Sequence, residues 1–208
     1  MSGARARTAS WDVLLVGGAS GVGKSRAAAQ LAEEAKAFVV EFDDIVAAVQ
    51  AVTTARGHPG LHHFDGDVSR LAPARVLELQ IATARALDPA LLGVVRNRLT
   101  VDVPAVVEGD YLTPAAAALA LREGAAAGRA VRAVFLHEGD PGQIAANYAC
   151  REPDEGDQAE RAGISAAYSR WLAGQAASHG LPVVEARPWS TLTARVRQAL
   201  DQGRTDAA

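Results

Sequence analysis

The sequence contains a single cysteine and no long apolar run, and both absences restrict what the chain can be. Cys150 has no second cysteine to pair with, so it can form neither an internal disulfide nor a Cys-x-x-Cys metal site. No stretch approaches the roughly 18 uninterrupted apolar residues of a membrane span, and residues 1–10 are basic but lack the apolar core of a secretory signal. We therefore expect a cytoplasmic protein that has no contact with a membrane.

Aromatic residues and net charge are also low. The chain has three Trp, three Tyr and four Phe, whereas 49% of its residues are hydrophobic, so aliphatic side chains and alanine must build most of the core. The formal charge is -3 and no stripe of Lys and Arg is present, so the charge pattern does not favour nucleic acid as a partner. A chain of 208 residues suits one domain. We expect residues 1–208 to form it, with about 11–201 ordered.

The most informative segment is rich in glycine. Residues 18–25 match the phosphate-binding pattern G-x-x-x-x-G-K-S, with an apolar run before them and a helix-favouring segment after them. In such a loop the backbone N–H groups turn toward a polyphosphate, the lysine reaches the β- and γ-phosphates, and the serine hydroxyl ligates Mg²⁺. The sequence therefore predicts a nucleotide site formed by Gly18, Ala19, Ser20, Gly21, Val22, Gly23, Lys24 and Ser25.

Strands and helices alternate along the rest of the chain. Apolar runs at 37–42, 103–107, 129–136 and 181–186 predict four more strands, the one at 37–42 expected to be buried, with helical segments between them. This alternation favours a parallel sheet between two layers of helices, with ligands bound at the carboxyl ends of the strands.

A region at 45–100 interrupts this alternation and is expected to be a helical insert that forms a substrate pocket. Its irregular part, 56–74, contains His58, His62 and His63, which are candidate polar residues of that pocket. His62 and His63 with Asp65 and Asp67 could form a metal site, but we favour solvated loop residues because adjacent histidines on a flexible segment have no fixed metal geometry. Of Arg96 and Arg98, on opposite flanks of one predicted helix, at most one can face the pocket, and we assign Arg98.

Acidic residues follow two of the predicted strands. Asp43 and Asp44 end the second, and Glu108 and Asp110 end the third, where a carboxylate of the Walker B type holds Mg²⁺. Strict alternation would place Glu108 and Asp110 on the same side, so alternation does not separate them. We favour Glu108 for the metal and Asp110 for the substrate. Asp44 is interpreted as a helix N-cap or a second contact to a substrate hydroxyl.

The loop occurs in GTPases, in mechanical ATPases and in kinases. No Asn-Lys-x-Asp guanine element is present, because Asn97 is followed by Arg and Asn147 by Tyr, and the chain is short for a mechanical ATPase. A charged segment, 151–161, is typical of a lid, and the arginines at its ends, Arg151 and Arg161, are placed to close over a transferred phosphate.

Taken together, these residues resemble the P-loop kinases of small metabolites, the nucleoside-monophosphate-kinase-like fold shared by shikimate kinase, chloramphenicol phosphotransferase and proteins similar to 2-phosphoglycerate kinase. The segments that carry the resemblance are 18–25, Phe42-Asp43-Asp44, 107–111 and 186–189. It implies a P-loop NTPase fold of the α/β class, with three α/β/α layers around a five-stranded parallel sheet in the order 2-3-1-4-5. It also implies that Arg187 and Pro188 hold adenine and that Asp43 is the catalytic base. The chain lacks the arginine pair that binds the acceptor phosphate in nucleotide kinases, so a nucleoside monophosphate is not the expected acceptor.

We therefore predict a phosphotransferase that moves the γ-phosphate of ATP, with Mg²⁺, to a hydroxyl of a small metabolite or an antibiotic-like molecule. The alternative is an ATP-binding regulatory protein or a plain ATPase without an acceptor. The expected catalytic residues are Lys24, Asp43 and Arg151, the metal ligands are Ser25 and Glu108, and the substrate contacts are Asp44, Asp110, Arg98 and Arg161. The sequence leaves the oligomeric state open, a homodimer included.

Overall fold

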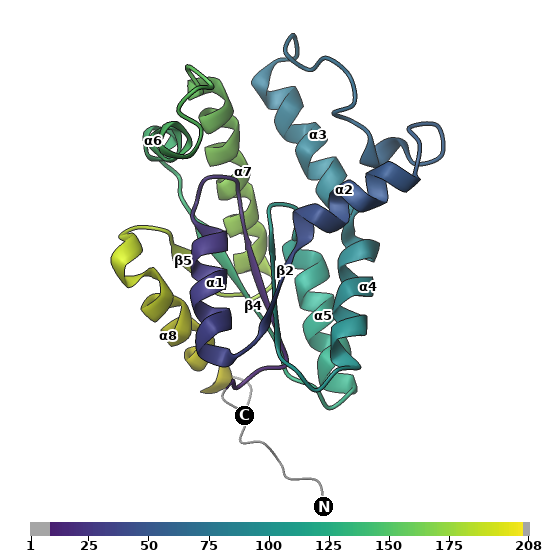
Figure 1. The fold of residues 1–208 in the computed structure, drawn as a ribbon, viewed down its shortest axis with the longest axis vertical. Helices are drawn as coiled ribbons and strands as arrows, with labels where there is room; N and C mark the ends of the chain where they lie inside the picture. The colour runs from purple at the N-terminus through teal and green to yellow at the C-terminus, as the bar shows by residue number, and fades with distance from the viewer. Residues whose placement is uncertain (1–8, 206–208) are drawn as a thin grey trace, which may run out of the picture.

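A five-stranded parallel sheet forms the centre of the protein (Figure 1). The computed structural model describes residues 9–205, so most of the basic segment 1–10 lies outside the described residues. The strands are β1 (Val13–Gly18), β2 (Phe38–Glu41), β3 (Ala105–Gly109), β4 (Val131–His137) and β5 (Val183–Glu185). Their order is β2-β3-β1-β4-β5 and each neighbouring pair is parallel. The predicted fold class and strand order are confirmed.

Helices cover both faces of this sheet. The helices are α1 (Lys24–Ala35), α2 (Phe42–Val52), α3 (Pro73–Ala86), α4 (Asp88–Leu99), α5 (Pro114–Ala126), α6 (Pro141–Arg151), α7 (Ala159–Ser178) and α8 (Leu192–Thr205). Helices α1 and α8 pack together against one face, and α4, α5 and α7 pack against the other. None of the described helices is long and apolar enough to cross a membrane.

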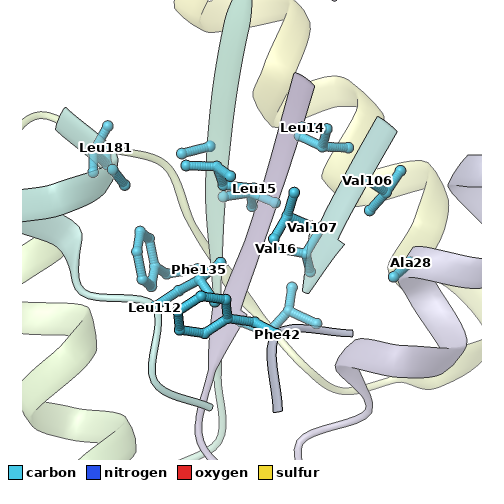
Figure 2. Packing of buried hydrophobic residues seen from close by; sticks show 14 of the residues in the cluster. Leu14, Leu15, Val16, Ala28, Phe42, Val106, Val107, Leu112, Phe135 and Leu181 are labelled. Atoms are coloured by element: carbon cyan, nitrogen blue, oxygen red, sulfur yellow. The ribbon is translucent and has the colours of Figure 1, made fainter. Parts of the chain in front are cut away.

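The core lies between the central strands and these helices. Every residue of β1 and β3 is buried, and Figure 2 shows Leu14, Leu15 and Val16 of β1 packed beside Val107 of β3 and Phe135 of β4. Such continuous apolar runs are typical of parallel strands that are covered on both faces.

The second strand is not buried, and the prediction that it would be is wrong. In β2 the exposed fraction of Phe38 is 56% and that of Val39 is 43%. The reason is its place at the edge of the sheet, where it pairs only with β3. A short apolar run in the sequence does not distinguish a central strand from an edge strand.

Helix α2 begins directly after β2, three residues earlier than the sequence predicts. Its N-cap is Glu41, which makes no side-chain capping hydrogen bond, and Asp43 and Asp44 lie in the first turn. The N-cap interpretation of Asp44 is therefore wrong. Acids in the first turn are still favourable because the helix dipole is positive there. Buried Phe42 fixes this turn to the core, which places Asp43 at the carboxyl edge of the sheet.

The insert stands above the carboxyl ends of the strands, where α2 and α3 lie across from α6 and α7 (Figure 1). Its loop is more ordered than predicted, with a 3-10 turn at Pro59–Leu61. His62 Nε2 lies 2.9 Å from Thr53 Oγ1 and its Nδ1 lies 2.7 Å from Asp65 Oδ2. Gln50 donates a 2.7 Å hydrogen bond to the carbonyl of Leu61. His62 therefore fastens the loop to α2.

Candidate nucleotide and acceptor site

The glycine-rich loop joins β1 to α1 in the geometry of an anion cradle. Gly21 and Gly23 have φ angles of 79° and 93°, in the left-handed region that glycine adopts without strain. Gly23 is also the N-cap of α1, so the unpaired N–H groups of the first helical turn face the loop. The predicted residues Gly18 to Ser25 are therefore brought together as a polyphosphate site requires.

Two side chains from distant parts of the chain hold this loop. Asn147 of α6 donates a 2.7 Å hydrogen bond to the carbonyl of Gly21, and Ser165 of α7 donates one of 2.7 Å to the carbonyl of Ser20. These two hydrogen bonds tie consecutive carbonyls of the loop to α6 and α7. Sequence reasoning missed both residues, and no local pattern marks them.

Lys24 lies at the centre of a group of carboxylates. It is buried, its Nζ donates a 3.0 Å hydrogen bond to the carbonyl of Ala19, and it forms an ion pair with Asp110. Burial alone would lower the pKa of Lys24, but the adjacent charges of Asp110, Glu108 and Asp43 outweigh it and the pKa is raised. The ammonium group therefore stays charged.

Asp43 has a shifted pKa. The residue as a whole is exposed, but its carboxyl lies against the end of β3 and accepts a hydrogen bond from the backbone N–H of Asp110. Loss of hydration, followed by repulsion from the charge of Asp110, raises the pKa of Asp43 to about 6, while Lys24 opposes the rise. A carboxylate of this kind is ionised at neutral pH and is a stronger base than an ordinary aspartate.

The side chains of Glu108 and Asp110 have different partners. The structure therefore distinguishes the two residues, which strand alternation alone could not do. β3 ends at Gly109, so Asp110 lies beyond the strand and turns to Lys24. Glu108 is buried and accepts a hydrogen bond from Ser25. Burial raises the pKa of Glu108, and the Ser25 hydrogen bond opposes that rise.

The pairing of Ser25 with Glu108 brings together the two residues predicted to hold Mg²⁺. No group of three or more metal-binding side chains occurs in the described part of the chain. Two oxygen ligands fit Mg²⁺ nonetheless, because this ion commonly keeps several waters and takes further ligands from the substrate phosphates.

A cavity of about 470 Å³ opens beside this group of charges. Its base is formed by Ser20, Asp110 and Tyr111, one wall by the insert and α3, and the other by α6 and α7. The wall residues are Phe64, Val68, Ser69, Val76, Gln80, Tyr148, Glu160, Arg161, Ile164 and Ser165. Nucleotide loop and cavity therefore meet at Ser20 and Asp110, as a reaction between two bound molecules requires.

A comparison with protein families matches residues 13–173, well over half of the chain, to the AAA domain family. The chain belongs to this family. The match begins at the first residue of β1 and continues into α7, so it includes the loop, the carboxylates and the cavity.

Solved structures of the same fold include two kinds of kinase. A gluconokinase from Sinorhizobium meliloti 1021 shares 15% identity with this AAA-domain chain, with a TM-score of 0.53 over 95% of this chain and 92% of that one. The shikimate kinase from Acinetobacter baumannii, in complex with shikimate, shares 12% identity, with a TM-score of 0.52 over 93% and 95%. These likenesses confirm the resemblance to the fold of small-molecule P-loop kinases. A comparison with curated proteins gave no significant match.

The predicted lid arginines of the AAA-domain chain lie together over the ring of Tyr148, a residue that lines the cavity. Arg161 lies 4.2 Å from the centre of the Tyr148 ring and Arg151 lies 5.4 Å from it. Both also pair with Glu152, each at 2.5 Å, and these charge-assisted bonds lower the pKa of that carboxyl. Arg161 lines the cavity. A catalytic contact by Arg151 stays a prediction.

Arg187 lies near the loop, as predicted. It donates a 2.6 Å hydrogen bond to Asn147 Oδ1, and its guanidinium lies 4.1 Å from the centre of the Trp189 ring. A Cβ placed on Gly23 would lie 3.2 Å from Trp189 Nε1, so this ring closely approaches the loop. Sequence reasoning assigned Arg187 and Pro188 to the nucleotide and included Trp189 only as part of the segment 186–189; Trp189 lines a second, smaller hollow of about 210 Å³.

Two predicted substrate contacts lie elsewhere. Arg98 lies 5.9 Å from the ring of Phe38, the first residue of β2, which is at the opposite end of the sheet from the loop. We therefore withdraw Arg98 from the site. Asp44 is exposed and does not line the cavity, so its contact with an acceptor stays a prediction. The assignment of Arg98 was wrong because the spacing of residues along a helix predicts which face a side chain occupies. It does not predict which end of the sheet that side chain lies near.

Proposed function

We propose that this AAA-domain protein is a kinase that transfers the γ-phosphoryl group of ATP to a hydroxyl group of a small molecule. The observation that carries the proposal is the position of Asp43, a carboxylate with a raised pKa, beside Lys24 and beside Asp110, which lies at the base of a cavity of about 470 Å³. An ATPase needs no separate cavity for a second substrate. Two neighbours of the same fold, the gluconokinase and the shikimate kinase, are kinases by name, which supports the same reading.

In this proposal each residue has a definite task. Asp43 accepts the proton of the attacking hydroxyl, a new P–O bond forms to the acceptor, and the bond between the γ-phosphorus and the β–γ bridging oxygen breaks, leaving ADP. Lys24 and the loop N–H groups stabilise the charge on the phosphate oxygens. Mg²⁺, held by Ser25 and Glu108, would neutralise further charge on the nucleotide. Arg161 lies at the cavity wall, on the acceptor side.

The test uses ATP labelled at the γ-phosphate and a mixture of candidate alcohols. The wild-type protein should move label to an acceptor, and Lys24→Ala should lose this activity. Asp43→Asn should lose transfer by at least about a hundredfold and keep nucleotide binding, because a general base contributes roughly 10²–10⁴-fold to rate. Asp201→Asn, which removes an exposed acid of α8, is the matched control and should behave like wild type. Label released only as free phosphate would refute the kinase and favour an ATPase or an ATP-dependent regulator.

A further inference from the structure

The acceptor cavity has an excess of negative charge. Asp110 and Glu160 line it, and Arg161 is the one Lys or Arg side chain among its described lining residues. Arg161 is already engaged, since it pairs with Glu152 at 2.5 Å, donates a 2.7 Å hydrogen bond to Gln158 and lies over the Tyr148 ring. The cation nearest to an acceptor is therefore committed to other partners.

The groups at the base of the cavity add to this excess. Lys24 is paired with Asp110, and Asp43 and Glu108 bring two further carboxyls to the same place. A nucleotide with its phosphates would contribute more negative charge than one Mg²⁺ removes. A carboxylate or phosphate on the acceptor would thus meet repulsion from several sides without a free cation to pair with.

Apolar side chains share the cavity lining with uncharged polar ones, which are Ser20, Ser69, Gln80, Tyr111 and Ser165. Phe64, Val68 and Val76 line it from the insert and α3, and Ile164 lines it from α7. The buried ring of Tyr148 lines it from α6. The neutral polar group of α3 that lines the same space is the amide of Gln80. The apolar side chains provide a surface on which a ring or a branched apolar body can be buried, and the polar ones provide hydrogen-bond partners for its hydroxyl.

From these observations we infer that the acceptor is an alcohol with a hydrophobic, ring-sized body and no negative charge, either neutral or cationic. The inference rests on the proposed kinase activity and narrows its substrate class. It also separates this chain from the shikimate kinase of the same fold, because shikimate carries a carboxylate and the cavity described above offers it no free partner.

The experiment sorts acceptors by charge before the assay. A metabolite extract, combined with a library of small alcohols, is passed over an anion exchanger to give an anionic and a non-anionic portion. Each portion is incubated with the full-length protein, Mg²⁺ and γ-labelled ATP, and labelled products are separated from free phosphate. We expect organic label mainly from the non-anionic portion, by at least about tenfold, because like charges brought together at a binding site cost several kcal/mol.

Matched acceptors refine the result. 4-(Hydroxymethyl)benzoate, 4-methylbenzyl alcohol and 4-(aminomethyl)benzyl alcohol share a ring and a primary hydroxyl and differ in charge. The expected order of transfer places the benzoate last. In Gln80→Arg, which adds a cation to the cavity, the disadvantage of the benzoate should shrink, whereas Ala74→Arg, an exposed site on the same helix, should leave it unchanged.

The outcomes separate the two proposals. Transfer mainly to the anionic portion, or a benzoate accepted as well as its neutral partner, would overturn the inference and leave the kinase standing. Label found only as free phosphate in both portions would overturn the kinase, and the inference with it.

Discussion

Replacing Asp43 by Asn should stabilise the protein at neutral pH while abolishing its transfer activity. The pKa of Asp43 is raised from 3.8 to about 6, first by loss of hydration and then by the charge of Asp110. A shift of about two units corresponds to at most roughly 3 kcal/mol, and solvent screening of an exposed residue reduces this to about 1 kcal/mol. Asn keeps the size and the hydrogen-bonding oxygen but carries no charge.

The direction of the pH dependence follows from the raised pKa. The folded protein holds the Asp43 proton more tightly than the unfolded chain does, so protonation contributes stability that is complete below about pH 4. That contribution is lost as the pH rises through about 6. We therefore expect the free energy of unfolding of Asp43→Asn to exceed that of wild type by about 1 kcal/mol at pH 7.5, with the difference shrinking toward pH 4.

Urea denaturation followed by tryptophan fluorescence measures this difference across the pH range. Transfer activity, measured in parallel, should rise in wild type with an apparent pKa of about 6, because the base acts when ionised, and the variant should lose this limb with its activity. A variant that is less stable than wild type at pH 7.5, or an activity that is independent of Asp43, would refute the assignment of this carboxyl as a base with a raised pKa.

Two further substitutions test how the site is held. Asn147→Ala removes the donor to the carbonyl of Gly21. Because a buried carbonyl left unpaired costs roughly 1–3 kcal/mol, we expect the Kd for ATP, measured by calorimetry, to rise about tenfold. An unchanged Kd would show that the loop needs no support from α6. Gly109→Ala would place a Cβ 2.9 Å from the Cβ of Phe42 and 3.3 Å from Asp43 Oδ1, so we expect a stability loss of about 1–3 kcal/mol in urea denaturation. Transfer should fall more than ATP binding, and an equal fall in both would contradict this placement of Asp43.

The sequence was sufficient for those features that have a local pattern. The loop at 18–25, the alternation of strands and helices and the acids after two strands are each written in a few consecutive residues, and the family resemblance supplied the strand order. Features that depend on distant partners were not predictable. Asn147 and Ser165 reach loop carbonyls more than a hundred positions away in the chain, and nothing in their own neighbourhoods indicates this.

The errors have the same physical origin. The apolar residues of β2 resemble those of a central strand, and only the packing of the whole sheet leaves Phe38 at an exposed edge. Arg98 does lie on a helix, as predicted, but at the end of the sheet opposite the glycine-rich loop. The N-cap interpretation of Asp44 assumed a loop between β2 and the following helix. In the structure β2 continues directly into α2, so Asp44 lies inside the first helical turn.

Asp110 connects the nucleotide and acceptor sides of the site through three different groups. Its carboxylate pairs with Lys24, its backbone N–H donates to the carboxyl of Asp43, and its carbonyl accepts a 3.1 Å hydrogen bond from Tyr168 of α7. Because one residue contacts Lys24, the carboxyl of Asp43 and α7, a movement of Lys24 toward a nucleotide would also change the charge next to Asp43. Release of the Asp110 carboxylate from Lys24 would leave more negative charge facing the cavity, which strengthens the preference for an uncharged or cationic acceptor at the moment when ATP is bound.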